Sequence, residues 1–110
     1  MNPLEIHVVE IPYDDIDSSK VRPALIIKIS NDNVYLFKVT SKYSNKSSKI
    51  KSFYYPLMDW KNAGLKIPSY IEIHKAYGIY KNIVKKSKLI GKLSSVDTIG
   101  LFKFINNRKK

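Results

Sequence analysis

The sequence predicts a mainly β domain with one C-terminal helix, an α+β fold in which the helix lies across a small, strongly curved β-barrel. Three observations predict it: short apolar stretches rich in β-branched and aromatic residues, turn residues between them, and one helical repeat near the end. The chain of 110 residues fits one domain, residues 1–110.

The first half of the chain predicts three strands and two loops. The strands are residues 4–11, 22–30 and 34–41. The polar stretch 12–20, which holds three aspartates, predicts a loop after the first strand. Residues 31–33 (Asn-Asp-Asn) predict a tight turn, because Asn and Asp tolerate a positive φ. Residues 42–51 predict a long, basic loop rich in Ser and Asn.

The second half predicts two more strands and one ambiguous segment. Residues 52–58 and 69–76 are the strands, and residues 59–64 turn the chain between them. Residues 77–88 fit a strand or a short helix equally well. Alternation along the strand 69–76 places Ile71 and Ile73 on one face. The polar or aromatic side chains on the other face are Tyr70, Glu72 and His74.

The chain ends in a predicted helix. Ser94 can cap its first turn, and Asp97 stands three residues later, close to a capping box. Val96, Ile99 and Phe102 recur at helical spacing. We expect these three side chains to pack in the core or in a dimer interface.

Charge and composition narrow the classes of function. The net charge of +11 favours a polyanionic partner, and nucleic acid is the obvious one. Lysine makes up most of the excess, so part of it fits an AT-rich coding bias. The chain has no cysteine and two histidines, so we expect no disulfide, metal or cofactor. No segment predicts a membrane span or a signal peptide, which favours a cytoplasmic protein without a membrane partner.

Four stretches, taken in order, resemble the MazF/PemK family of toxins. They are residues 20–27 (KVRPALII), 39–41 (VTS), 59–65 (DWKNAGL) followed by Pro68 and Ser69, and 90–94 (IGKLS) with Asp97. The resemblance implies an SH3-like barrel, a homodimer, inhibition by a cognate antitoxin, and sequence-specific, metal-independent cleavage of single-stranded RNA. It also implies Arg22 and Thr40 as the catalytic pair. The chain departs from the family before Arg22, and at Glu72 and His74, where some members have Arg and Asp.

RNA cleavage can use these residue types without a metal. The 2′-OH attacks the adjacent phosphate and leaves a cyclic phosphate and a 5′-OH end, which restricts the reaction to RNA. Arg22 can donate two hydrogen bonds to the phosphate, a geometry that Lys cannot match. Thr40 offers a hydroxyl. The alternatives are that Arg22 pairs with the nearby aspartates Asp14, Asp15 or Asp17, and that Thr40 is an ordinary strand residue.

Further residues are candidates for RNA contact and proton transfer. The RNA-binding candidates are Lys20, Ser41, Lys42, Tyr43, Lys46 and Lys49, in which cations and one ring suit a single strand with a stacked base. The alternative is a solvated, flexible loop. His74 can carry a proton near neutral pH, or it is a half-exposed strand residue.

A second class of function fits the same features. A non-catalytic nucleic-acid-binding module on the same SH3-like barrel also explains the charge and the aromatic residues. In either case a surface this basic should attract an acidic segment of an antitoxin.

Overall fold

The computed structural model describes residues 1–11 and 20–108 and contains seven strands and three helices. The strands are β1 (Glu5–Ile11), β2 (Lys20–Ile29), β3 (Asn33–Thr40), β4 (Tyr54–Pro56), β5 (Tyr70–Glu72), β6 (Tyr77–Tyr80) and β7 (Lys88–Lys92). The helices are α1 (Ser48–Lys51), α2 (Lys81–Lys85) and α3 (Ser95–Arg108). Apart from Lys20, which begins β2, the predicted loop at 12–20 lies outside the described residues. None of the described helices combines the length and apolar character needed to cross a bilayer.

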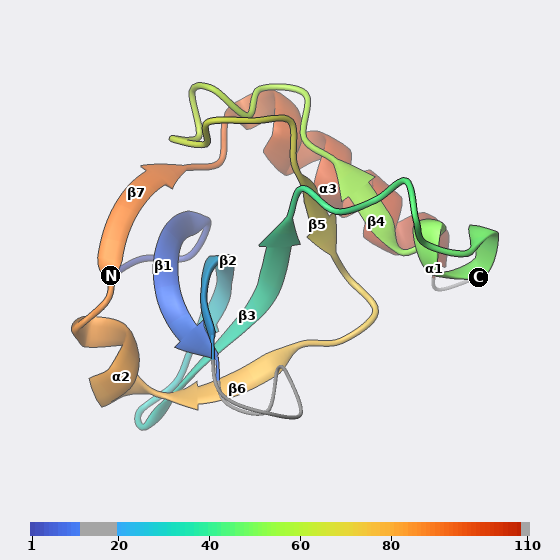
Figure 1. Ribbon diagram of the computed structural model, residues 1–110. Coiled ribbons are helices and arrows are strands. Elements are labelled where there is room, and N and C mark those ends of the chain that lie inside the picture. Colours follow the sequence, from blue (N-terminus) through green and yellow to red (C-terminus); the bar gives the residue numbers. More distant parts are fainter. Residues whose placement is uncertain (12–19, 109–110) are drawn as a thin grey trace.

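The strands form one antiparallel sheet in the order β4-β5-β3-β2-β1-β7, and β6 pairs with the first half of β3. The prediction of a mainly β domain with a C-terminal helix is therefore confirmed. The sheet curves strongly around the middle of the molecule (Figure 1). Register shifts after Ile6 and between Ile26 and Lys28 contribute to this curvature, because a bulge bends its strand. Among the described strands no pairing joins β4 to β7.

Two apolar clusters cover the two faces of the central strands. Because side chains alternate along a strand, Leu25 packs in one cluster, while Ala24 and Ile26 pack in the other. Leu101 of α3 belongs to the first cluster and Val84 of α2 to the second. The two helices therefore cover opposite faces of the sheet (Figure 1).

A buried carboxylate fixes the start of α3. Ser94 caps the helix as predicted, since its hydroxyl accepts a hydrogen bond from the Asp97 amide at 3.2 Å. The Asp97 side chain is fully buried and does not return to Ser94. It accepts hydrogen bonds from the Tyr55 hydroxyl at 2.8 Å and from the amides of Met58 and Asp59 at 2.9 and 2.8 Å. Burial, with this bond to Asp97, raises the pKa of Tyr55.

The prediction that the stripe on α3 packs in the core is wrong. Val96, Ile99 and Phe102 are 61%, 57% and 52% exposed, and Leu101 is buried in their place. The physical reason is the buried Asp97, whose three hydrogen bonds set the rotation of the helix about its axis. The alternative, that this stripe packs in a dimer interface, stays a prediction.

Three segments differ from their predicted form. The loop 42–51 contains the short helix α1, which begins after Ser47, whose hydroxyl accepts from the Ile50 amide. The ambiguous segment 77–88 holds both a strand and a helix, β6 and α2, and the first residue of β7. The strands expected at 52–58 and 69–76 are each reduced to three residues, although backbone hydrogen bonds from Ile73 to Phe53 and from Leu57 to Ser69 join the two segments beyond the strand ends.

Candidate active site

Both residues of the expected catalytic pair lie where β2 begins and β3 ends. Ala24 pairs with Lys38 in the register of these two strands. Beyond this pair the two strands have other partners, because Arg22 pairs with Val9 of β1 and Thr40 pairs with Tyr70 of β5. The pairing of β2 with β3 brings the two strand ends near one another, although they are distant in the sequence.

Arg22 and Thr40 line one cavity of about 410 Å³. Ser41 and Lys42 follow Thr40 into its wall, and Lys66 lines it from the loop before β5. Apolar residues of β1, β2, β3 and β7 supply much of the remaining lining. None of the described lining residues is acidic, so the local field favours an anion.

The hydroxyl of Thr40 is held in place by the turn that follows β3. Its Oγ1 accepts a hydrogen bond from the Lys42 amide at 3.1 Å. The hydroxyl hydrogen can still be donated, and a phosphate oxygen in the cavity is a suitable acceptor. Thr40 is half-buried and Lys42 is exposed, so both are within reach of a ligand.

The opposite wall of the cavity depends on a close approach of two backbones. Gly64 has a φ of +90°, and a Cβ at this position would stand 2.0 Å from the Ile90 carbonyl oxygen. A Cβ on Gly91 would meet the Ala63 carbonyl oxygen at the same distance. Only glycine lets the loop pack against β7 here. This packing brings Lys66 to the cavity, a residue that sequence reasoning missed.

A second polar cluster lies on the same face of the sheet as Thr40. Thr40 pairs with Tyr70, so Glu72 stands two residues further along that face. The Glu72 carboxylate is buried and lies 3.6 Å from Lys38 Nζ and 3.8 Å from His74 Nδ1. Alternation predicted the face of Glu72 but not its burial, which comes from the covering side chains.

Tyr54 completes this cluster. Tyr54 pairs with Glu72 across β4 and β5. Burial, together with the Glu72 charge, raises the pKa of Tyr54 to about 12, so the phenol stays protonated. His74 stacks on Tyr54, with an interplanar angle of 9°, and is not among the residues lining the cavity. The candidate proton carrier is therefore joined to Glu72 and lies outside the Arg22 cavity.

Tyr43 lies next to the cavity because its ring stacks on the ring of Tyr70. Its ring is parallel to that of Tyr70, with the centroids 4.2 Å apart, and Tyr70 is the strand partner of Thr40. Lys51 Nζ stands 4.9 Å from the Tyr43 centroid. A cation and an aromatic ring thus meet beside the expected catalytic pair.

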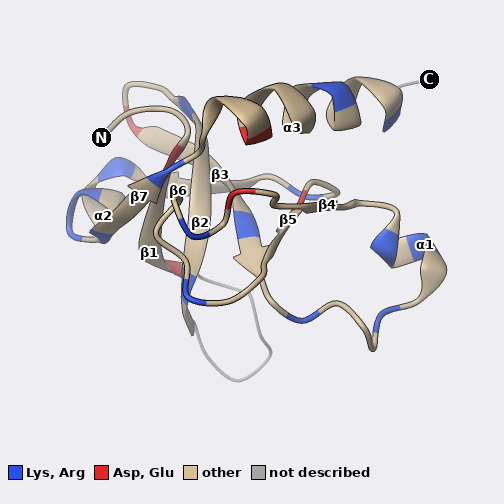
Figure 2. Cartoon of the chain, turned by 90° about the horizontal axis from the view of Figure 1, so that it is seen from above, with Lys and Arg blue, Asp and Glu red and all other residues tan. Residues whose placement is uncertain are grey.

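The other RNA-binding candidates lie further out. Lys46 and Lys49 belong to the projecting segment around α1 and are not among the lining residues of the cavity (Figure 2). The side chain of Lys20 lies outside the described residues, as do Asp14, Asp15 and Asp17. Four of the sequence-predicted residues, Arg22, Thr40, Ser41 and Lys42, therefore share one cavity.

Within the described residues, no group of three or more His, Asp or Glu side chains could hold a metal ion. The polar groups of the cavity are cations, hydroxyls and backbone groups, a set suited to an anion. Comparison with protein-family models gives no match, and comparison with curated proteins gives none either.

Proposed function

We propose that the chain is a metal-independent endoribonuclease that cuts single-stranded RNA at specific sequences, the toxin of a type II toxin–antitoxin pair of the MazF/PemK kind. One observation carries the proposal: Arg22, Thr40 and Lys42 line a single cavity that has no acidic residue among its described lining. Such a cavity suits a phosphodiester, which is anionic and needs several donors at once.

Each residue then has a definite task in the reaction. The 2′-oxygen forms a bond to phosphorus while the bond to the 5′-oxygen breaks, so negative charge builds on the phosphate oxygens. Arg22 donates two hydrogen bonds to these oxygens, and Thr40 donates a third. The 2′-OH proton leaves as the bond forms, and the 5′-oxygen takes up a proton as it departs. Proton transfer by His74 stays a prediction, because His74 lies beside Glu72 and does not line this cavity.

The test is incubation of the purified protein with a long RNA of mixed sequence in EDTA. We expect discrete cuts that leave cyclic phosphate and 5′-OH ends, and no cuts by Arg22→Ala at unchanged thermal stability. Equal cleavage by Arg22→Ala would contradict the assignment. Cleavage only after addition of a divalent metal would contradict the metal-independent mechanism.

A non-catalytic RNA-binding module is the second candidate. The stack of Tyr43 on Tyr70, with Lys51 over it, favours this candidate because it provides a ring and a cation without needing a reaction. The same incubation separates the two. Intact RNA retained in a complex that weakens steeply with salt would support the module and exclude the enzyme.

The proposal also covers the binding partners of the chain, its fold class and its location in the cell. The exposed stripe on α3 is apolar and uncharged, which suits contact with a second copy of this basic chain in a homodimer. An acidic segment of the antitoxin would bind the basic cavity and block it. We further propose that the curved sheet belongs to the SH3-like barrels and that the protein acts in the cytoplasm, where its RNA substrates are.

A further inference from the structure

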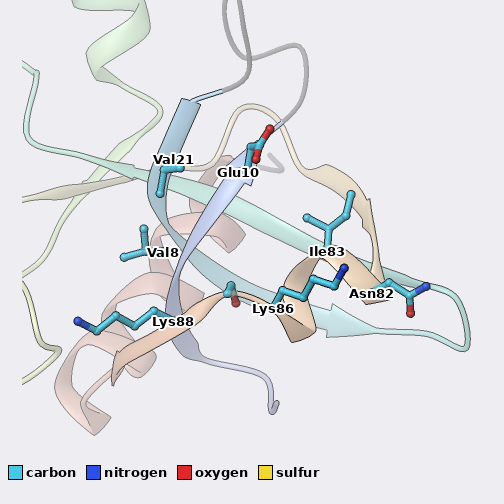
Figure 3. Close-up of a pocket in the computed structure, with 8 residues that line it drawn as sticks. Val8, Glu10, Val21, Asn82, Ile83, Lys86 and Lys88 are labelled. Carbon is cyan, nitrogen blue, oxygen red and sulfur yellow. The ribbon is translucent and has the colours of Figure 1, made fainter.

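A second cavity adjoins the first beside β1 and β2. It has a volume of about 500 Å³ and is lined by residues of β1, β2, α2 and the start of β7 (Figure 3). Val8 and Val21 line both this cavity and the one that contains Arg22. The two cavities are therefore neighbours, with Val8 and Val21 between them, and a ligand too long for the first can extend across these residues into the second.

The lining of the second cavity has the mixed chemistry that a nucleotide needs. Lys86 and Lys88 bring two exposed ammonium groups, which can bind phosphate oxygens. Val8, Val21 and Ile83 offer apolar surface for a base or ribose face. Glu10 and Asn82 also line the cavity and can bond to the edges of a base (Figure 3).

The two lysines are held at the cavity by a connection to β1. Ser87, between them, hydrogen-bonds through its hydroxyl to His7 Nδ1 at 2.8 Å. The same hydroxyl bonds to the carbonyl of Val84, which closes the end of α2. Lys88 is also the strand partner of Val8. Because the backbone around both lysines is anchored, binding would order only their side chains.

We propose that this second cavity binds the RNA strand that flanks the cleaved bond, with Lys86 and Lys88 on its phosphates and a base against Val8, Val21 and Ile83. The inference rests on the proposed function for its ligand class. A single strand fits better than an acidic peptide, because the second cavity pairs cations with apolar surface and adjoins the Arg22 cavity. The acidic peptide is kept as an outcome of the test.

The test is equilibrium binding of 2′-O-methylated single-stranded RNA, which lacks the attacking hydroxyl and stays intact. A long oligonucleotide of about twelve nucleotides spans both cavities, and a short one of about three fills only one. We compare K86A/K88A with K92A/K103A. The control removes two exposed lysines that are absent from the lining of both cavities. Circular dichroism checks that both variants are folded.

We expect K86A/K88A to bind the long RNA about ten-fold more weakly, with a salt slope lower by about 1.4, since about 0.7 is lost per phosphate. Binding of the short RNA and of the control variant should stay near the wild type. An equal loss in K92A/K103A would show a bulk charge effect and overturn the proposal. Unchanged RNA binding together with lost binding of a polyglutamate peptide would assign the surface to an acidic partner and also overturn it.

Failure of this inference can be told apart from failure of the proposed enzyme. Cleavage of RNA by a K86A/K88A variant with unchanged affinity for long RNA would keep the enzyme and remove the second cavity from its substrate path. Selective loss of long-RNA affinity in a protein that never cleaves would keep the second cavity and remove the enzyme.

Discussion

Two polar regions of this small protein differ in how deeply they are buried. At the start of α3, Asp97 is fully buried and accepts three hydrogen bonds from the chain around it. At the ends of β2 and β3, Arg22 and Thr40 are half-buried and line a cavity. The first arrangement stabilises the fold and leaves no room for a ligand. The second lines a cavity that a ligand can enter.

The largest expected effect is loss of the Asp97 network. Asp97→Ala should lower the free energy of unfolding by about 4 kcal/mol, because two backbone amides and the Tyr55 hydroxyl lose their acceptor. Urea denaturation measures the loss. Asp97→Asn, which keeps one acceptor oxygen, should lose about half as much.

Asp59→Ala is the matched control for this variant. The Asp59 carboxylate bonds only to Asn62 at the surface, so removing it should cost less than about 1 kcal/mol. A similar loss from Asp59 and Asp97 would remove the distinction between a closed network and an open surface.

The next effect is on cleavage and leaves stability unchanged. Arg22→Lys keeps the charge but loses the planar fork, so we expect the cleavage rate to fall about 100-fold. The free energy of unfolding should stay within about 0.5 kcal/mol. Arg108→Lys, at the only other arginine, is the control and should cut RNA at the wild-type rate. Full activity of Arg22→Lys would mean that charge alone suffices.

A smaller effect concerns the outer face of α3. If the stripe joins two copies, Ile99→Glu places one charge on each side of the interface, and the dissociation constant should rise at least about ten-fold. Sedimentation velocity measures it. Ile50→Glu, at an exposed isoleucine of α1, should leave the assembly intact. A wild-type protein that is monomeric at all concentrations would contradict the dimer.

The smallest effect is a dependence of stability on acid. A hydrogen bond from His7, at 2.9 Å, is the main cause that lowers the pKa of Glu5 from 4.5 to about 2. A lowered pKa contributes stability above the unfolded value, so this contribution should fade as the pH drops from about 4.5 to 2. Because solvent near Glu5 screens its charge, we expect this contribution to stability to be modest.

Chemical denaturation at a series of pH values measures this dependence. Glu5→Gln should remove that part of the acid loss, whereas Asp32→Asn, in the exposed turn before β3, should retain it. Parallel acid curves for the wild type and Glu5→Gln would show that the Glu5–His7 bond contributes nothing.

The sequence predicted those features that depend on residues close to one another along the chain. Alternation and β-branched residues predicted the first three strands, and Ser94 marked the start of α3. The helical spacing of Val96 correctly predicted the helix, but that spacing does not say which apolar stripe faces the core. Asp97, a charged residue, occupies the buried side because its partners come from the 55–59 segment.

Part of the candidate site could be predicted in the same way. Arg22 and Thr40 were found by resemblance, and Lys42 and Tyr43 by the mixture of cations and rings in their loop. Lys66 carries no local signal, since its place depends on Gly64 packing against Ile90. Alternation along the strand predicts the face of the sheet on which Glu72 lies. Its burial beside Lys38 could not be predicted, because Lys38 lies on β3, a different strand.

The sequence by itself determined the type of most elements, the basic charge, the absence of thiol chemistry and the identity of the groups that can act on a phosphate. These depend on composition and on short-range backbone preferences. Only the tertiary structure decided which of those groups share a cavity, which carboxylate is sealed inside, and that a second cavity with Lys86 and Lys88 adjoins the first. Such proximities come from strand register and backbone packing between distant segments, and no local pattern encodes them.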